Sequence, residues 1–183
     1  MELFKGKAHF LIRQPNLLRV ETSAGERSYL IVSDGKILTI YSPRQRKYAQ
    51  MPAPASPTAA VELVSGEMGV ESQVLNFIGV VDDVVTGAAG PSVSAAGSNT
   101  IGGRKCDRFT VVGQMGDEKW EAWLENSEVP LLCKLNYHNI DGPAQTNEFT
   151  WKLNPALPPE TFVFSPPEGS TKVDVGSLGA TSP

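Results

Sequence analysis

Histidine and cysteine are scarce in this sequence. The chain of 183 residues contains only His9 and His138, and only Cys106 and Cys133. Two histidines without paired cysteines are too few for a four-ligand zinc site. His9 shares its predicted strand face with basic residues and His138 precedes a turn, so we expect both to be solvated. The sequence therefore predicts no metal site and no cofactor.

The motifs of common catalytic sites are also missing. There is no Gly-x-Ser-x-Gly elbow, no Walker loop and no Gly-x-Gly-x-x-Gly after a predicted strand. Residues 98–103 are glycine-rich but lead into a strand, so we do not expect them to bind phosphate. The remaining carboxylates are scattered, and the pair Asp82-Asp83 fits the polar face of a helix. We predict no catalytic residues and no enzymatic activity.

Long hydrophobic runs are absent, and the overall charge is small. No run approaches the ~18 apolar residues of a membrane span, so we expect no transmembrane segment. The net charge of −4 argues against nucleic acid as a partner. Residues 1–57 nevertheless carry +5 and residues 58–183 carry −9. A solvated mixed surface explains this asymmetry, and so does a basic edge that meets an acidic partner or lipid headgroups.

The clearest structural signal is a β-hairpin over residues 29–41. Two β-branched runs meet at Asp34-Gly35, the dipeptide that best tolerates a type I′ turn. A two-residue turn of this kind pairs Ser33 with Lys36. Both faces of the ribbon are then apolar near its middle, so we expect a covering element on each side.

Alternating apolar and polar residues predict further antiparallel strands. The expected strands are residues 3–13, 17–22, 106–112, 119–124, 131–137, 146–153 and 161–164. The proline-rich residues 51–57 are expected to be a crossing segment. Residues 57–64 predict a short helix and residues 70–86 a longer one. Residues 87–103 are expected to be a loop.

These elements predict a mainly β protein with helices, of the α+β class. Eight antiparallel strands interrupted by one or two helices form a strongly curved sheet, an unclosed half-barrel, with a helical lid over its concave face. We expect a single domain over residues 1–175 and a disordered tail at 176–183. No signal peptide is visible, and residues 3 and 4 already read as strand, as expected of a mature chain.

The two cysteines are predicted to face opposite sides of the sheet. Cys106 is in phase with Arg108, whereas Cys133 is in phase with Leu135. In a simple meander their strands are separated by a third strand, about 9–10 Å apart. A disulfide needs Cα atoms within roughly 7 Å. We therefore expect two free thiols, although an exported protein could join them.

Several motifs resemble those of the outer-membrane lipoprotein carrier (LolA) superfamily. They are Gln14-Pro-Asn-Leu-Leu-Arg-Val-Glu21, Val32-Ser-Asp-Gly-Lys-Ile-Leu-Thr-Ile-Tyr-Ser-Pro43 and Phe162-Val-Phe-Ser-Pro-Pro-Glu-Gly169. The middle of the chain looks closer still to a less characterised family of predicted periplasmic proteins thought to share that fold. Its features are Gly103-Arg-Lys-Cys-Asp107, Trp120-Glu-Ala-Trp123, Pro130-Leu-Leu and Trp151-Lys-Leu-Asn-Pro-Ala-Leu-Pro158. Together these motifs cover nearly the whole chain.

This resemblance implies a LolA-like half-barrel with a helical lid over an apolar cavity. The carriers work in the periplasm, where they hold the acyl chains of lipoproteins. Here Gln14 stands where the carriers have arginine, and the amino-terminal helix usual in the fold is missing from this chain. The resemblance implies a periplasmic, exported protein whose signal peptide is not in this chain.

We therefore predict a non-enzymatic periplasmic binding protein that holds a lipid or lipoprotein acyl chain in the concave face. The expected cavity residues are all apolar and are Phe10, Ile12, Leu18, Val20, Ile31, Leu38, Ile40, Trp120 and Trp151. Taken individually, each of them is explained more readily by ordinary core packing, and sequence does not separate a filled core from a cavity. The alternative is an interaction, sensor or scaffold module that binds an envelope protein at a sheet edge or at the basic turn Arg44–Lys47.

Overall fold

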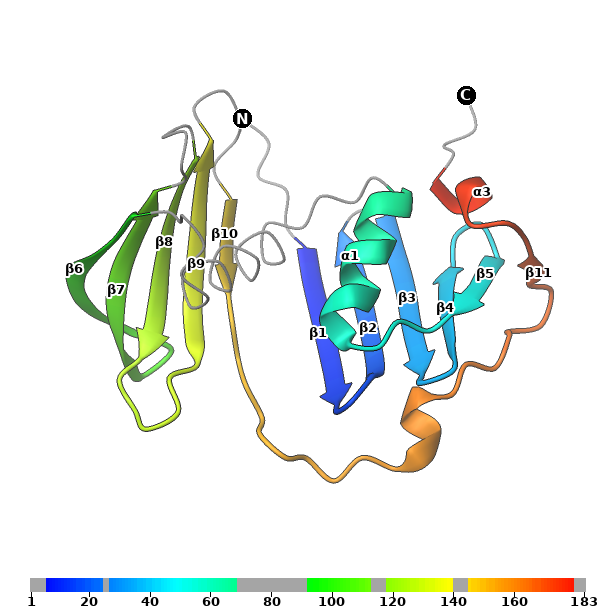
Figure 1. Ribbon diagram of the computed structural model, residues 1–183, viewed down its shortest axis with the longest axis horizontal. Helices are drawn as coiled ribbons and strands as arrows, with labels where there is room; N and C mark the ends of the chain where they lie inside the picture. Colours follow the sequence, from blue (N-terminus) through cyan, green and yellow to red (C-terminus); the bar gives the residue numbers. More distant parts are fainter. Residues whose placement is uncertain (1–5, 25–26, 69–91, 113–117, 140–144, 180–183) are drawn as a thin grey trace. The chain divides into compact units, whose positions relative to one another are not determined.

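The computed structural model describes residues 6–24, 27–68, 92–112, 118–139 and 145–179, which form two open sheets and few helices (Figure 1). The first sheet has the order β1-β2-β3-β4-β5-β11, with β1 Gly6–Arg13, β2 Leu17–Ala24, β3 Arg27–Asp34, β4 Ile37–Ser42, β5 Lys47–Pro52 and β11 Thr171–Lys172. The second has the order β10-β9-β8-β7-β6, with β6 Ser92–Ile101, β7 Arg104–Val112, β8 Glu118–Glu125, β9 Leu132–Asn139 and β10 Gln145–Glu148. The predicted α+β class is confirmed, but two sheets replace the single curved sheet.

The chain divides into two compact units where the sequence predicted one domain. The first unit comprises Met1–Glu71 and Ala156–Pro183, and the second comprises Ser72–Pro155. The first sheet belongs to the first unit and the second sheet to the second unit. The second unit is therefore an insertion between two segments of the first.

The predicted hairpin is present as β3 and β4, but its register is shifted by two residues. Ser33 lies opposite Leu38, so the two-residue turn that paired it with Lys36 is wrong. The last pair of the hairpin is Ser33 with Leu38, so residues 34–37 form the turn. The Asp34 carboxylate stabilises this turn by accepting hydrogen bonds from the backbone N–H groups of Lys36 (2.8 Å) and Ile37 (2.7 Å). Gly35 has φ +88° in this turn. Because the shift is even, every side chain stays on its predicted face.

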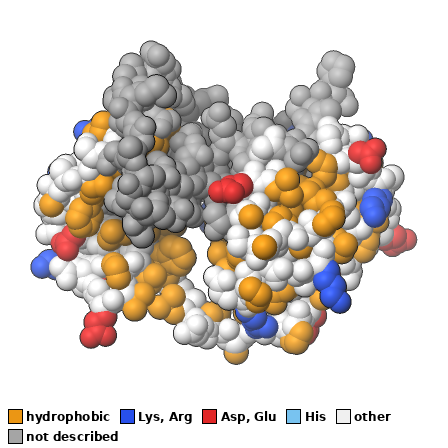
Figure 2. Space-filling view, viewed as in Figure 1, with side chains coloured by type: hydrophobic (Ala, Val, Ile, Leu, Met, Phe, Trp, Pro, Cys, Tyr) orange, Lys and Arg blue, Asp and Glu red, His pale blue; other side chains and the backbone are white. Residues whose placement is uncertain are grey.

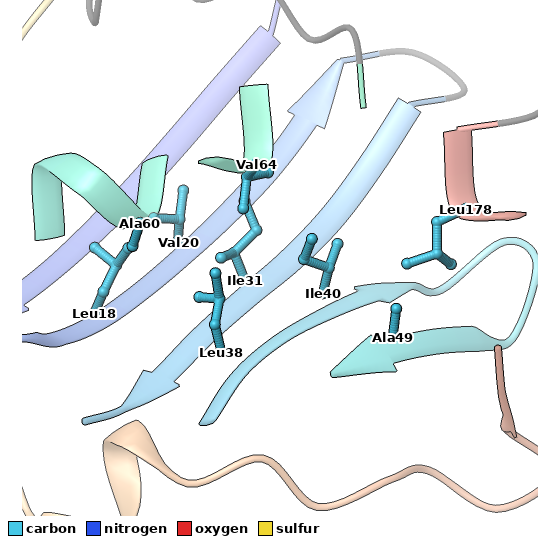
Figure 3. Packing of buried hydrophobic residues seen from close by; sticks show 9 residues of the cluster. All are labelled: Leu18, Val20, Ile31, Leu38, Ile40, Ala49, Ala60, Val64 and Leu178. Carbon is cyan, nitrogen blue, oxygen red and sulfur yellow. The ribbon is translucent and has the colours of Figure 1, made fainter. Parts of the chain in front are cut away.

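One face of the first sheet is covered by helices α1 (Pro57–Met68) and α3 (Gly176–Gly179). We call it the helix-covered face. Its buried side chains are Leu18, Val20, Ile31, Leu38, Ile40 and Ala49 of the sheet, Ala60 and Val64 of α1, and Leu178 of α3 (Figure 3). Leu38 and Ile40 are therefore packed in a core under α1 and α3, and the lid expected over residues 70–86 lies outside the described residues.

Helix α1 begins as the sequence predicts and runs four residues further. The Ser56 Oγ accepts the backbone N–H of Ala59 at 3.1 Å, and Pro57 follows as the first helical residue, where its missing N–H costs nothing. The predicted disordered tail from residue 176 is wrong for its first four residues. They form α3, because Leu178 is only 1% exposed and belongs to the core.

The opposite face of the first sheet is covered by the carboxyl-terminal segment. The buried side chains of Val32, Thr39 and Tyr41 point to this side. Phe162 is 1% exposed, and the Phe164 ring lies 5.7 Å from that of Tyr41. The prediction that both faces of the hairpin are covered is therefore confirmed.

The strand predicted over residues 161–164 is wrong. Residues 159–162 form a short 3-10 helix, η1 (Pro159–Phe162), because Pro158 and Pro159 lack the N–H groups that a strand ladder needs. A strand that the sequence did not reveal, β11, follows and pairs in parallel with β5. Thr171 donates its backbone N–H to the Arg46 carbonyl at 2.9 Å, which closes this edge of the sheet.

Two predictions for the second unit also need correction. Residues 92–101 form β6 instead of a loop. The pairing of β6 with β7 is made by main-chain hydrogen bonds, and small side chains do not prevent these bonds from forming. A register shift between Ala95 and Ser98 accommodates Gly97, which has φ +97°. The strand predicted over residues 146–153 ends at Glu148. The helix predicted over residues 70–86 lies outside the described residues.

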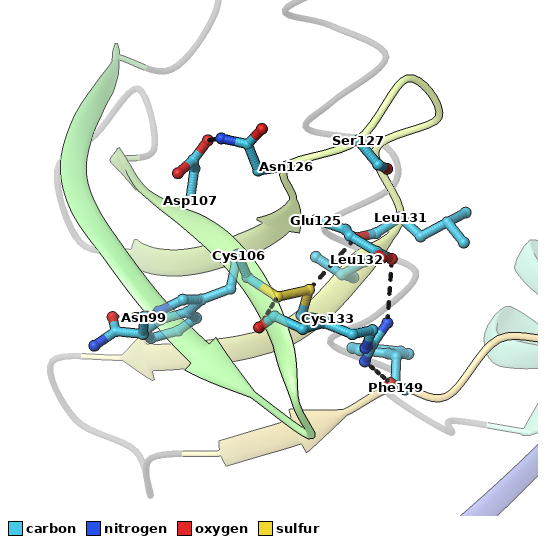
Figure 4. Close-up of a disulfide and its surroundings, with 12 residues drawn as sticks. Asn99, Cys106, Asp107, Glu125, Asn126, Ser127, Leu131, Leu132, Cys133 and Phe149 are labelled. Atoms are coloured by element: carbon cyan, nitrogen blue, oxygen red, sulfur yellow. Dashed lines mark hydrogen bonds and ion pairs between the residues drawn. A yellow bond between two sulfur atoms is a disulfide. The ribbon is translucent and has the colours of Figure 1, made fainter.

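The prediction of free thiols is wrong, because Cys106 and Cys133 form a disulfide (Figure 4). The pairing of β8 with β9 contains a β-bulge at Cys133. Trp123 lies opposite Lys134, and the next residue of β8, Leu124, lies opposite Leu132, so Cys133 has no partner on β8. The bulge reverses the side-chain phase and turns Cys133 to the side of Cys106. The Cα atoms are 6.6 Å apart, so β7 and β9 approach each other across the end of β8.

Replacing both cysteines by serine is expected to lower the free energy of unfolding of the second unit. The loop between them spans 27 residues, so the loss should be about 3–4 kcal/mol. Urea unfolding followed by tryptophan fluorescence measures it, because all three tryptophans lie in the second unit. Reductant should destabilise the natural chain and leave the double variant unchanged. Uptake of maleimide by the denatured, unreduced natural chain would contradict the disulfide.

Replacing Asp34 by alanine should loosen the hairpin. Two backbone N–H groups lose their carboxylate acceptor, at a cost of about 1–3 kcal/mol. Amide hydrogen exchange of β3 and β4 measures this loss. Asp34→Asn is the matched control, because it keeps a side-chain oxygen and should lose less than Asp34→Ala. Equal exchange rates in the two variants would show that this oxygen does not hold the turn.

Candidate functional site

The structure separates the nine predicted cavity residues. Leu18, Val20, Ile31, Leu38 and Ile40 come together in the helix-covered core of the first unit. Trp120 and Trp151 belong to the second unit. Trp120 is 1% exposed in the core of the second sheet, whereas Trp151 is 45% exposed. Phe10 and Ile12 lie on β1 and remain open to solvent.

Phe10 and Ile12 extend the helix-covered face beyond the part that is buried. Phe10 pairs with Val20 and Ile12 with Leu18, so their side chains point to the same side as the core. They are nevertheless 40% and 51% exposed. We call these two side chains the β1 strip. Hydrophobic side chains also gather on the visible surface around α1 (Figure 2).

Basic residues on the other side of the first sheet hold the carboxyl-terminal segment. The Arg13 guanidinium donates to the Leu157 carbonyl at 2.6 Å and lies over the Phe162 ring, 5.4 Å from its centroid. Arg19 donates to the Thr161 carbonyl at 3.4 Å and pairs with Glu21. These arginines therefore stabilise the fold on that side.

A pocket of about 410 Å³ lies on the second unit beside the disulfide. We call it the Trp151 pocket. It is lined by Ile101, Gly102, Arg104, Glu125, Leu131, Cys133, Glu148, Phe149, Thr150 and Trp151. Its wall therefore combines aromatic and aliphatic side chains with one guanidinium and two carboxylates.

The polar and aromatic groups of the Trp151 pocket are held in place by direct contacts. Arg104 donates to the Phe149 carbonyl at 2.6 Å and lies 3.6 Å from the Glu125 carboxylate. The Trp151 indole N–H donates to the Leu132 carbonyl at 2.6 Å, and its ring stacks on Phe149 with centroids 6.1 Å apart. A ligand would meet groups that are already oriented, which lowers the entropic cost of binding.

A second pocket of about 450 Å³ adjoins the first and shares Ile101, Gly102 and Glu148 with it. Trp123 lines this second pocket. Its indole N–H donates to the Asn99 side chain at 3.0 Å, and the Lys134 ammonium lies over its ring, 5.3 Å from the centroid. We call the two pockets together the trough. The trough brings together side chains from β6, β7, β8 and β9 and from the segment around β10.

Sequence reasoning found one residue of the trough, Trp151, and assigned it to a different cavity. Arg104 and Glu125 are far apart in the chain, and only the pairing of β7 with β8 brings them together. The sequence motif that could have indicated the trough is Gly103-Arg-Lys-Cys-Asp107, because it contains the pocket residue Arg104 and the disulfide cysteine Cys106.

The histidines lie on the surface. His9 is exposed on β1, and the His138 imidazole is 3.8 Å from the Glu121 carboxylate. Within the described ranges, no group of three or more histidine, cysteine, aspartate or glutamate side chains is arranged to hold a metal ion.

The fold defines the class of this protein as a mainly β protein of two open sheets. Of the helices in the described residues, none has the length and hydrophobicity needed to cross a membrane. The chain belongs to the family described as predicted periplasmic protein (DUF2092), whose sequence profile matches residues 3–176. The protein is accordingly periplasmic. None of the curated proteins matches the sequence significantly.

Acrylamide is expected to quench mainly the fluorescence of Trp151. Its side chain is 45% exposed, whereas Trp120 and Trp123 are 1% and 6% exposed. Trp151→Phe should therefore remove most of the quenchable signal while keeping an aromatic ring beside Phe149. A variant whose quenching equals that of the natural chain would show that the Trp151 ring is covered.

Proposed function

We propose that this protein is a non-enzymatic periplasmic binding protein for a hydrophobic ligand, a lipid or a lipoprotein acyl chain. The ligand lies along the helix-covered face of the first sheet and enters at the β1 strip. The observation that carries the proposal is the pair Phe10 and Ile12, which are in phase with the buried core and yet 40% and 51% exposed.

The elements around the β1 strip suit an acyl chain. Phe10 and Ile12 continue the apolar row that begins with Val20 and Leu18 under α1. The helix contacts the core of this face through Ala60, Leu63 and Val64. An alkyl chain that took the place of α1 would restore the apolar contacts that the helix makes with the sheet.

In this function, the first unit acts as the lidded half-barrel that the sequence resemblance implies. The strands β1 to β5 form the wall and α1 forms the lid. Burial of each methylene contributes roughly 0.8 kcal/mol to the free energy of binding. About ten buried methylenes therefore contribute about 8 kcal/mol, which corresponds to a micromolar dissociation constant before the entropic cost of binding is subtracted. A lipoprotein acyl chain supplies that length.

Binding is tested with a fluorescent fatty-acid analogue added to the delipidated protein. The double variant Phe10→Ser, Ile12→Ser should weaken binding about five- to thirtyfold, because it removes two apolar contacts of about 1 kcal/mol each. Val129→Ser is the matched control, since Val129 is 59% exposed but lies on the second unit. It should bind the probe as the natural chain does.

Lipid extraction with mass spectrometry provides a second, independent readout. The natural chain purified from the periplasm should carry lipid, and the double variant should carry less. A natural chain that carries no lipid and does not respond to the probe would rule out the proposal. If Val129→Ser lost as much probe binding as the Phe10→Ser, Ile12→Ser double variant, the probe would not bind at the β1 strip.

Partner binding at a sheet edge is the second candidate function. Its support is β1, which has β2 on one side and no neighbouring strand on the other among the described residues. The edge near the basic turn Arg44–Lys47 is covered, because β11 pairs with β5. If the turn itself recruits a partner, reversing the charges of Arg44, Arg46 and Lys47 should abolish that complex and leave binding of the fatty-acid probe intact.

A further inference from the structure

Trp151 offers a flat ring of fixed orientation to a ligand in the trough. Its indole N–H is held by the Leu132 carbonyl at 2.6 Å, and the Phe149 ring supports it at an interplanar angle of 14°. The side chain is nevertheless 45% exposed and lines the pocket. A ring that is already held loses little conformational entropy when another flat, apolar surface stacks on it.

Beside this ring the pocket carries both hydrogen-bond donors and acceptors. The Arg104 guanidinium has only donors, and the carboxylates of Glu125 and Glu148 have only acceptors. The side chains of Arg104 and Glu125 are partly exposed, at 26% and 28%. A hydroxyl group both donates and accepts, so a ligand with several neighbouring hydroxyls can satisfy all three side chains.

The same lining disfavours other classes of ligand. An alkyl chain would take Arg104, Glu125 and Glu148 out of water without replacing their hydrogen bonds. In the Trp151 pocket, a phosphate or carboxylate group would meet two carboxylates beside one guanidinium, and a simple cation would meet the guanidinium. The pocket volume of about 410 Å³ falls within the range of roughly 300–1,000 Å³ typical of small-molecule sites.

We propose that the Trp151 pocket of the trough binds a neutral saccharide, with one sugar ring stacked on Trp151 and its hydroxyls bound by Arg104, Glu125 and Glu148. The apolar C–H face of a pyranose matches the indole, and its hydroxyl rim matches the charged side chains. This site is on the second unit and is independent of the acyl-chain site proposed for the first.

Isothermal titration calorimetry with chitotriose, cellotriose, maltotriose and mannotriose tests the proposal on the intact, oxidised chain. At least one of these trisaccharides should bind with a dissociation constant below about 10 mM, the weak end of measurable affinity. Trp151→Ala should weaken that binding at least about tenfold, as truncation of a central tryptophan does. Trp151→Phe keeps an aromatic platform and should stay within about threefold.

Matched controls separate the site from the rest of the second unit. Glu148→Gln removes one charged acceptor and should weaken binding about fivefold. Glu128→Gln changes an exposed carboxylate outside the trough and should have no effect. Leu153→Ala changes an exposed apolar side chain, 57% exposed and outside the trough, and should also have no effect.

Three outcomes decide the proposal. Binding that is lost in Trp151→Ala and kept in both controls supports it. Absence of binding by all four trisaccharides overturns it, and so does binding that Trp151→Ala and Glu148→Gln leave unchanged. The double variant Phe10→Ser, Ile12→Ser should bind saccharide normally, so failure of the acyl-chain proposal is distinguishable from failure of this one.

Discussion

The first unit depends on covering both faces of the β3–β4 hairpin. Ile31, Leu38 and Ile40 are apolar on one face, and Val32 and Tyr41 on the other. A sheet with two apolar faces is stable in water only when a second layer lies on each. Helices α1 and α3 supply one layer, and η1 with Phe164 supplies the other. The position of the carboxyl-terminal segment follows from this requirement.

This arrangement makes the first unit discontinuous in sequence. Its last segment, from residue 156 onward, contributes to both faces and to one edge of the sheet, through η1, α3 and β11. Those contacts join residues more than 100 positions apart, as the bonds of Arg13 to Leu157 and of Arg19 to Thr161 show. Contacts of such separation form late in folding, because loop closure must precede them. The second unit is contiguous and has no such delay.

The sequence identified most strands because period-two alternation is a local property. It predicted the faces of β3 and β4 correctly, yet it missed their register, because the Asp34 carboxylate holds a longer turn than Asp-Gly alone suggests. It missed β6, whose small residues carry no alternation, and the bulge at Cys133, which only strand pairing reveals. The sequence could not predict the trough for the same reason, because Arg104, Glu125 and Trp151 come together only after the sheet has formed.

The disulfide also determines how the second unit would respond to a pulling force. The 27-residue span between Cys106 and Cys133 is a closed covalent loop that contains β8 and the turn after it. In an oxidising compartment such as the periplasm this loop persists. At about 3.3–3.6 Å per extended residue, roughly 90 Å of chain cannot be drawn out. The second unit would therefore be less extensible than its length implies, and passage through a narrow pore would require two strands of chain to enter side by side.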